Sequence, residues 1–419
     1  MKKDILPAPR VLSPAGSFES LRAAMQGGAD AVYFGVGKLN MRSRSAKNFT
    51  IEDLDEIVAI CREHNTLSYL TLNTIIYDEE LAEMRHIVDR AKEAGVSAII
   101  ASDMSVMQYA RQQGVRVHIS TQCNITNLES VRAYAHYADV MVLARELNLR
   151  QVHDLVKGIE REQITGPSGE LIAIEIFVHG ALCMAVSGKC YLSLDNMNFS
   201  ANRGACLQLC RRSYLVTDKE EGYELEVDHQ YIMSPKDLCT IGFLDKIIHT
   251  GAAILKIEGR GRSADYVKTT TRCYKEAVQA VLDGTYSREM VEAWTQRLET
   301  VFNRGFWDGY YLGRRMGEWA DRYGSQATRR KQYVGKVTNY FSKLGVAEIT
   351  LETRELAAGT ELMITGPTTG VVELVATEIR LSDKAVAQVR KGDVCSVKVA
   401  EAVRRGDKVF SMITETDPY

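Results

Sequence analysis

Four of the nine cysteines in this chain lie within 28 residues, at Cys183, Cys190, Cys206 and Cys210. Their spacing is C-x6-C-x15-C-x3-C. Thiolates bind soft metals, and four of them complete either a zinc site or an iron–sulfur cluster. Structural zinc sites usually pair their ligands as C-x2–4-C, and only the last pair here fits that rule. The spacing leaves both sites open, with buried thiols that bind no metal as a third interpretation.

Small and basic residues accompany these thiols. Gly180, Gly188 and Gly204 would let backbone amides approach the sulfurs, which is one way in which a protein tunes the potential of a cluster. Basic side chains would offset the negative charge of a cluster, and three stand close in the sequence: Lys189, Arg203 and Arg211.

The composition is that of a globular protein, with 45% apolar and 25% charged residues. No run approaches the roughly 18 apolar residues that a membrane-spanning helix needs, and residues 1–7 lack the apolar core of a secretory signal. We therefore expect a cytoplasmic protein with no membrane partner, in which clustered cysteines bind metal rather than form disulfides. The formal charge of −2 implies that an anionic ligand must meet a local basic patch.

The cysteines interrupt an alternation of predicted strands and helices. Strand and helix patterns alternate about eight times over roughly 250 residues, as in a (β/α)8 barrel of the TIM type. A doubly wound open sheet is the lesser alternative, and no G-x-G-x-x-G follows the first strand. The predicted strands are Val11–Ser13, Ala31–Gly35, Leu67–Leu72, Ala98–Ala101, Val115–Ser120, Val140–Ala144, Ala173–Val178 and Ile254–Ile257.

The α/β pattern extends over only part of the chain. We predict a TIM-like barrel over residues 1–262, with a cysteine-rich insertion at about 183–252, and a helical and aromatic connector over 263–330. From residue 331 to 419 short alternating strands and glycine-containing turns indicate a small antiparallel β-barrel domain. Residues on the catalytic face of an α/β barrel follow the C-terminal ends of its strands, where Gln122, Arg145 and Glu258 are found.

The cysteine segment resembles the signature of the collagenase-like peptidase family (peptidase family U, number thirty-two). It reads E-x-F-x-x-G-A-L-C-x6-C-x-L-S from Glu175 to Ser193. The resemblance spans roughly residues 10–330. Other blocks match the family in order: Leu12–Gly16, Gly28–Tyr33, Arg145–Leu147 and Lys256–Arg260.

The resemblance implies an oxygen-independent hydroxylase rather than a protease. Characterised relatives bind a 4Fe-4S cluster through four cysteines, and those with the C-x3-C ending resemble tRNA hydroxylation proteins that form 5-hydroxyuridine at the wobble position with prephenate. Related proteins hydroxylate ribosomal RNA or ubiquinone precursors. One branch takes its fourth ligand farther downstream, so Cys239 is an alternative to Cys210. Because Cys206 and Cys210 are one helical turn apart, we favour Cys210.

A dicarboxylate cosubstrate such as prephenate needs paired cations, and arginine gives bidentate geometry. Glu258 and Glu146 would orient these cations or transfer protons. The predicted catalytic residues are Arg145, Lys256, Glu258 and Arg260, and the predicted cofactor-binding residues are Arg42, Arg44 and Gln122.

Two other classes of function remain as alternatives, a peptidase and a non-catalytic RNA-binding or cluster-carrier protein. The sequence has no G-x-S-x-G and no H-E-x-x-H, and neither His118 nor His179 has an acidic partner by spacing. Basic and aromatic residues interleave over 304–336, which is typical of surfaces that hold unpaired RNA bases and equally of a packed connector. The sequence identifies no protein partner.

Overall fold

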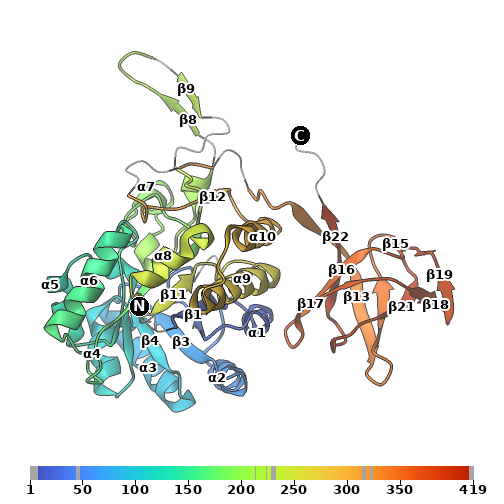
Figure 1. Ribbon diagram of the computed structural model, residues 1–419, viewed down its shortest axis with the longest axis horizontal. Helices are drawn as coiled ribbons and strands as arrows, with labels where there is room; N and C mark the ends of the chain where they lie inside the picture. The colour runs from blue at the N-terminus through green and yellow to red at the C-terminus, as the bar shows by residue number, and fades with distance from the viewer. Residues whose placement is uncertain are drawn as a thin grey trace.

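The computed structural model describes residues 8–43, 48–212, 214–222, 224–227, 233–313, 318–320 and 324–414. Within this part of the chain, eight parallel strands form a closed barrel, because the last strand pairs with both the first and the seventh. The predicted (β/α)8 barrel is thus confirmed (Figure 1). The strands are β1 (Arg10–Pro14), β2 (Ala31–Gly35), β3 (Leu67–Leu72), β4 (Ala98–Ala101), β5 (Val117–Ile119), β6 (Val140–Val142), β7 (Ala173–Ala181) and β11 (Ile254–Ile257).

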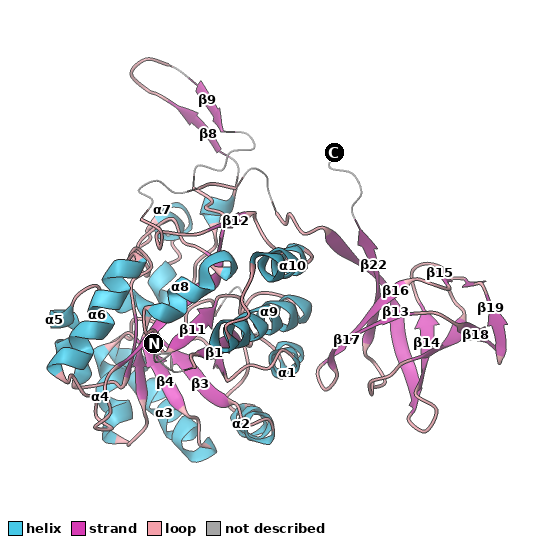
Figure 2. Cartoon of the chain, viewed as in Figure 1, coloured by secondary structure: helices cyan, strands magenta, loops and turns pink. Residues whose placement is uncertain are grey.

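Amphipathic helices surround this barrel (Figure 2). In α6, buried Val152, Leu155, Val156 and Ile159 recur at helical spacing and face the sheet. Its start is fixed by a capping box between Asn148 and Gln151. The helices are α1 (Phe18–Gln26), α2 (Leu54–Glu63), α3 (Leu81–Ala94), α4 (Met104–Gln112), α5 (Leu128–Ala135), α6 (Leu149–Glu162), α8 (Leu244–His249), α9 (Ala264–Asp283) and α10 (Arg288–Glu299). No described helix is long and apolar enough to cross a membrane.

The segment between β7 and β11 covers the C-terminal end of the barrel. It contains the short helix α7 (Leu192–Met197) and the projecting hairpin β8–β9 (Tyr214–Thr217 and Glu224–Val227), which Figure 1 shows, and also β10 (Asp237–Cys239). Strand β10 pairs antiparallel with β7 and parallel with β12 (Phe306–Trp307). Through β10, both the insertion and the segment after α10 are therefore joined by strand pairing to the C-terminal end of β7.

The C-terminal region forms an antiparallel sheet of its own, as predicted. Its strand order is β17-β16-β22-β13-β14-β21-β18-β19, and buried side chains such as Val334, Ile349 and Val409 form a separate core. The strands are β13 (Arg329–Phe341), β14 (Val346–Leu351), β16 (Glu361–Gly366), β17 (Gly370–Val375), β18 (Ile379–Leu381), β19 (Lys384–Val386), β21 (Val394–Lys398) and β22 (Lys408–Thr414), with a ribbon of β15 (Leu356–Ala357) and β20 (Gln388–Val389). Gln26 of α1 donates to the Thr369 carbonyl at 3.0 Å and accepts from the Val371 amide at 2.9 Å, which joins the two parts.

The interpretation of residues 304–336 as an exposed stacking surface is wrong for two of its aromatic residues, whereas Trp319 is exposed. Trp307 and Tyr311 are buried in the barrel core, because the segment packs along β10 rather than facing solvent. Arg304 pairs with Asp237 at 3.2 Å, and Lys331 pairs with Asp265. Arg314, Arg315, Arg322 and Tyr323 lie outside the described residues.

Candidate functional site

A pocket of about 160 Å³ opens at the C-terminal ends of the barrel strands. Arg44 lies outside the described residues and Glu146 is exposed and not part of the lining, but the other predicted site residues line this one pocket. They are Arg42, Gln122, Arg145, Cys183, Cys190, Cys206, Cys210, Lys256, Glu258 and Arg260. Residues as much as 218 positions apart, Arg42 and Arg260, thus meet because parallel strands bring all their C-terminal ends to one face.

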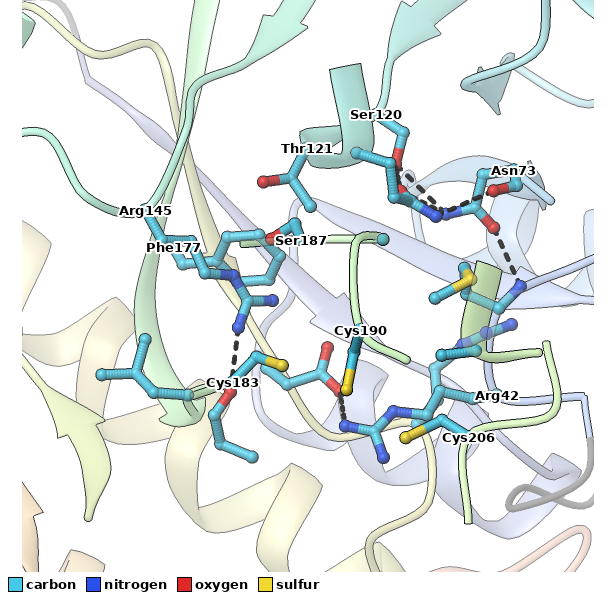
Figure 3. A pocket seen from close by; sticks show the side chains of 18 of the residues that line it. Arg42, Asn73, Ser120, Thr121, Arg145, Phe177, Cys183, Ser187, Cys190 and Cys206 are labelled. Carbon is cyan, nitrogen blue, oxygen red and sulfur yellow. Dashed lines mark hydrogen bonds and ion pairs between the residues drawn. The ribbon is translucent and has the colours of Figure 1, made fainter. Parts of the chain in front are cut away.

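The four clustered cysteines surround the pocket mouth. Figure 3 shows Cys183, Cys190 and Cys206 beside the same space, with Arg42 and Arg145 at its sides. Burial raises the pKa of Cys190 and of Cys210, and the nearby thiolates add to the rise. Gly180 brings the end of β7 close to β11: its φ is +101°, and a Cβ there would lie 2.3 Å from the Glu258 carbonyl oxygen.

Four thiols line one pocket, and all-cysteine ligation is a donor set that suits a 4Fe-4S cluster as well as a zinc ion. Cys210 lines this pocket, whereas Cys239 is not among its lining residues and has its sulfur 3.9 Å from the hydroxyl of Tyr274.

Basic side chains make up most of the other charged groups of the lining. Among the described lining residues, Arg42, Arg145, Arg211, Lys256 and Arg260 face a single carboxylate, Glu258. Burial opposes the ionisation of Glu258, but Arg42, Arg145 and Arg260 outweigh it and lower the pKa of this carboxyl group. The pocket is therefore strongly cationic before any thiolate forms, which suits anionic ligands.

Each arginine is held differently. Arg42 Nη2 lies 3.6 Å from Glu258 Oε1, and the backbone of Arg42 has a φ of +67°, which non-glycine residues rarely adopt. Arg260 donates to Asn40 Oδ1 and Thr71 Oγ1, both at 2.9 Å.

Arg145 stacks 3.9 Å from the ring of Phe177 and donates to the Ala181 carbonyl at 3.1 Å. Its Nε is buried and has no hydrogen-bond partner among the described residues.

Lys256 forms the floor of the pocket. Its Nζ donates to Glu175 Oε1 at 2.6 Å and lies 4.6 Å from the ring centre of Tyr33. The Tyr33 hydroxyl donates to Glu258 Oε2 at 3.1 Å. Tyr33 and Phe177 were not predicted as site residues, although both fall within predicted strands, where alternate side chains point into the barrel.

Gln122 forms a wall. Its Nε2 donates to the Asn73 carbonyl at 2.8 Å, and its Oε1 accepts from Asn73 Nδ2 at 3.2 Å and from the Ser120 hydroxyl. A Cβ on Gly188 would lie 2.9 Å from Gln122 Cγ, so a larger residue at 188 would displace this wall. Both the nitrogen and the oxygen of the Gln122 side-chain amide are already hydrogen-bonded within the protein. Gln122 therefore shapes the pocket wall more than it offers donors to a ligand.

No histidine lines the described pocket. His118 and His179 are buried elsewhere in the barrel. Burial lowers the pKa of His118 to about 3 and that of His179 to about 4, so both rings are neutral at pH 7. A thiol in the pocket therefore lacks the neighbouring imidazole that activates the nucleophile of a cysteine peptidase.

The fold and site define an α/β-barrel protein with a thiol-lined, cationic pocket. The model of peptidase family U32 matches residues 16–321, and the chain belongs to this family. It is 57% identical to a protein named collagenase from Porphyromonas gingivalis, over 96% of this chain and 97% of that protein. It is 32% identical to tRNA hydroxylation protein P1 of Bacillus subtilis, over 87% and 85%. It is also 32% identical to the 23S rRNA 5-hydroxycytidine C2501 synthase of Escherichia coli, over 74% of this chain and 46% of that protein.

Proposed function

We propose that this chain is an iron–sulfur-dependent RNA hydroxylase that forms 5-hydroxyuridine at the tRNA wobble position with prephenate as cosubstrate. The observation that carries the proposal is the convergence of four thiols and five basic side chains on one described pocket. Two of the relatives reported above are named for hydroxylation of tRNA or rRNA bases, which supports this chemistry.

In this proposal Cys183, Cys190, Cys206 and Cys210 hold a 4Fe-4S cluster, which would supply one-electron chemistry beside the substrate. Arg145 and Arg42 bind the carboxylates of the cosubstrate, because guanidinium groups pair with carboxylates in bidentate fashion. Lys256 presents a cation at the floor. Glu258, which the surrounding arginines keep ionised, accepts a proton or orients Arg42.

The competing hypothesis is a peptidase, which the relative named collagenase supports. Peptide hydrolysis requires an activated nucleophile or a metal-bound water. The described pocket contains thiols but no histidine, so no thiol there has a neighbouring imidazole to activate it. These observations favour the hydroxylase.

The deciding experiment is anaerobic purification of the full chain, followed by iron and sulfide analysis and by incubation with prephenate and tRNA that lacks the modification. We expect about four irons and four sulfides per chain and 5-hydroxyuridine in the nucleoside mass spectrum. A colourless protein that cleaves denatured collagen would overturn the proposal, and hydroxylated rRNA or a hydroxylated quinone precursor would redirect it to another substrate.

A further inference from the structure

A second, smaller cavity of about 70 Å³ lies beside the main pocket, beyond Arg42 and Glu258. Arg42, Gln208, Glu258 and Arg262 line it, together with Ala181 at the end of β7 and the loop 259–261 after β11. About 10–15 Å³ of such volume holds one water, so this cavity has room for a group of several heavy atoms.

Arg262 is the least satisfied cation at this cavity. Its side chain is only 16% exposed, and its guanidinium stacks 3.6 Å from the ring of Phe302. Its ion pair with Asp237 is long, at 3.8 Å, and Asp237 lies closer to Arg304, at 3.2 Å. None of the five guanidinium hydrogens of Arg262 makes a hydrogen bond with the described residues at ordinary distance. The guanidinium thus lines the cavity with donors that no described acceptor takes up, and an oxyanion in the cavity would supply acceptors for them.

The charges around the cavity also favour an anion. Arg42 and Arg262 face one carboxylate, Glu258, which Arg42 and the Tyr33 hydroxyl already engage. Burial is the main reason why the pKa of Arg262 is lowered. The positive charges of Arg304 and Arg42 lower it further. An oxyanion between the two guanidiniums would relieve this repulsion.

The position of the cavity matches a recurring use of the barrel fold. In (β/α)8 barrels the loops after the seventh and eighth strands often bind phosphate. Here β7 and β11 are those strands, and the end of one and the loop after the other both line the cavity.

We propose that Arg262 and Arg42 form a phosphate subsite. Building on the proposed function, the ligand is a backbone phosphate of the RNA next to the nucleotide whose base enters the main pocket. A free phosphate ion shares this chemistry. The two arginines would then fix the register of the RNA while the main pocket reads the base.

The test uses the full-length chain, Arg262→Gln, and Arg288→Gln as the control. Arg288 lies on α10 with an 87% exposed side chain, so its variant loses one charge far from the cavity. Inorganic phosphate is compared with chloride at constant ionic strength, with the melting temperature as readout. Because phosphate also stabilises folded proteins without a specific site, we expect it to raise the melting temperature of the wild type and the control clearly more than that of Arg262→Gln. If that variant does not fold, Arg262→Lys, which keeps the charge but not the fork, must weaken the phosphate effect. An equal effect in wild type and variant, or no effect in the wild type, overturns the subsite.

The source of the phosphate is decided by tRNA binding at several salt concentrations. Loss of one phosphate contact in a single-stranded loop should lower the slope of log affinity against log salt by about 0.7 in Arg262→Gln and not in the control. An unchanged slope combined with a lost phosphate effect overturns the RNA assignment and leaves a free phosphate as ligand. If the wild type binds no tRNA, the proposed function fails, while the melting experiment still decides the subsite.

Discussion

Lys256 Nζ lies 2.6 Å from Glu175 Oε1 inside the barrel, and their side chains are 6% and 0% exposed. Two buried charges of opposite sign compensate each other, whereas either one alone would be strongly destabilising in this environment. Glu175 therefore acts as the fixed counterion that lets the pocket floor carry a cation. Its Oε2 has no hydrogen-bond partner among the described residues, and His118 Nδ1 is 3.9 Å away.

Breaking this pair should cost stability in a non-additive way. We expect Glu175→Gln and Lys256→Met each to reduce the free energy of unfolding by about 3–5 kcal/mol, because each leaves one buried charge unpaired. The double variant removes both charges and should lose clearly less than the sum of the two. Urea denaturation of the four proteins measures this coupling. Effects that add to within about 0.5 kcal/mol would show that the two side chains act independently.

Buried His118 should make the fold sensitive to acid. Its pKa is about 3 in the folded chain and about 6.5 when unfolded, so the unfolded state binds more protons between these values. The contribution of neutral His118 to the free energy of unfolding is fully present above pH 6.5. It falls as the pH is lowered toward 3. Between pH 6.5 and 5 the loss from this histidine should be about 1–2 kcal/mol. Unfolding measured at both pH values should show this loss reduced in His118→Gln, and an unchanged pH dependence in that variant would contradict the assignment.

The fold was largely predictable because the strands have local signals. The predicted bounds of Ala31–Gly35, Leu67–Leu72, Ala98–Ala101 and Ile254–Ile257 agree with the structure residue by residue. Each is a short apolar run between polar turns, and the repeated alternation with helices specifies the barrel. The polar residues that follow these strands were then placed on one face by the topology alone.

Pairings across the barrel were not predictable in the same way. Nothing in the sequence indicates that Glu175 neutralises Lys256, 81 positions away, or that Arg262 faces a cavity beside Arg42. The buried state of Trp307 was equally hidden, because aromatic residues near arginines look alike in a packed connector and on an RNA-binding surface. Such properties depend on which segments the barrel brings together.

The four pocket cysteines should be individually required for iron. Replacing any one of Cys183, Cys190, Cys206 and Cys210 by serine should remove most of the iron and sulfide from anaerobically prepared protein, because a hydroxyl is a poorer ligand for iron than a thiolate. Iron analysis and visible absorption give the readout. The control is Cys239→Ala, which alters a buried thiol beside Tyr274. Loss of the cluster in this control, with retention in Cys210→Ser, would make Cys239 the fourth ligand.

Arg145 should bind the cosubstrate without supporting the cluster. Its guanidinium stacks on Phe177 and donates to the Ala181 carbonyl, so its orientation beside the pocket is fixed before a carboxylate arrives. A hydrogen bond to a charged group contributes about 1.5–3 kcal/mol. Arg145→Ala should therefore raise the KM for prephenate roughly 10- to 100-fold, with the iron content and visible spectrum unchanged. Arg145→Lys keeps the charge but loses the planar guanidinium group. Its KM for prephenate should lie between that of the wild type and that of Arg145→Ala. Full activity of Arg145→Ala at low prephenate would remove Arg145 from the cosubstrate site, whereas loss of iron in that variant would instead give it a structural role beside Cys183.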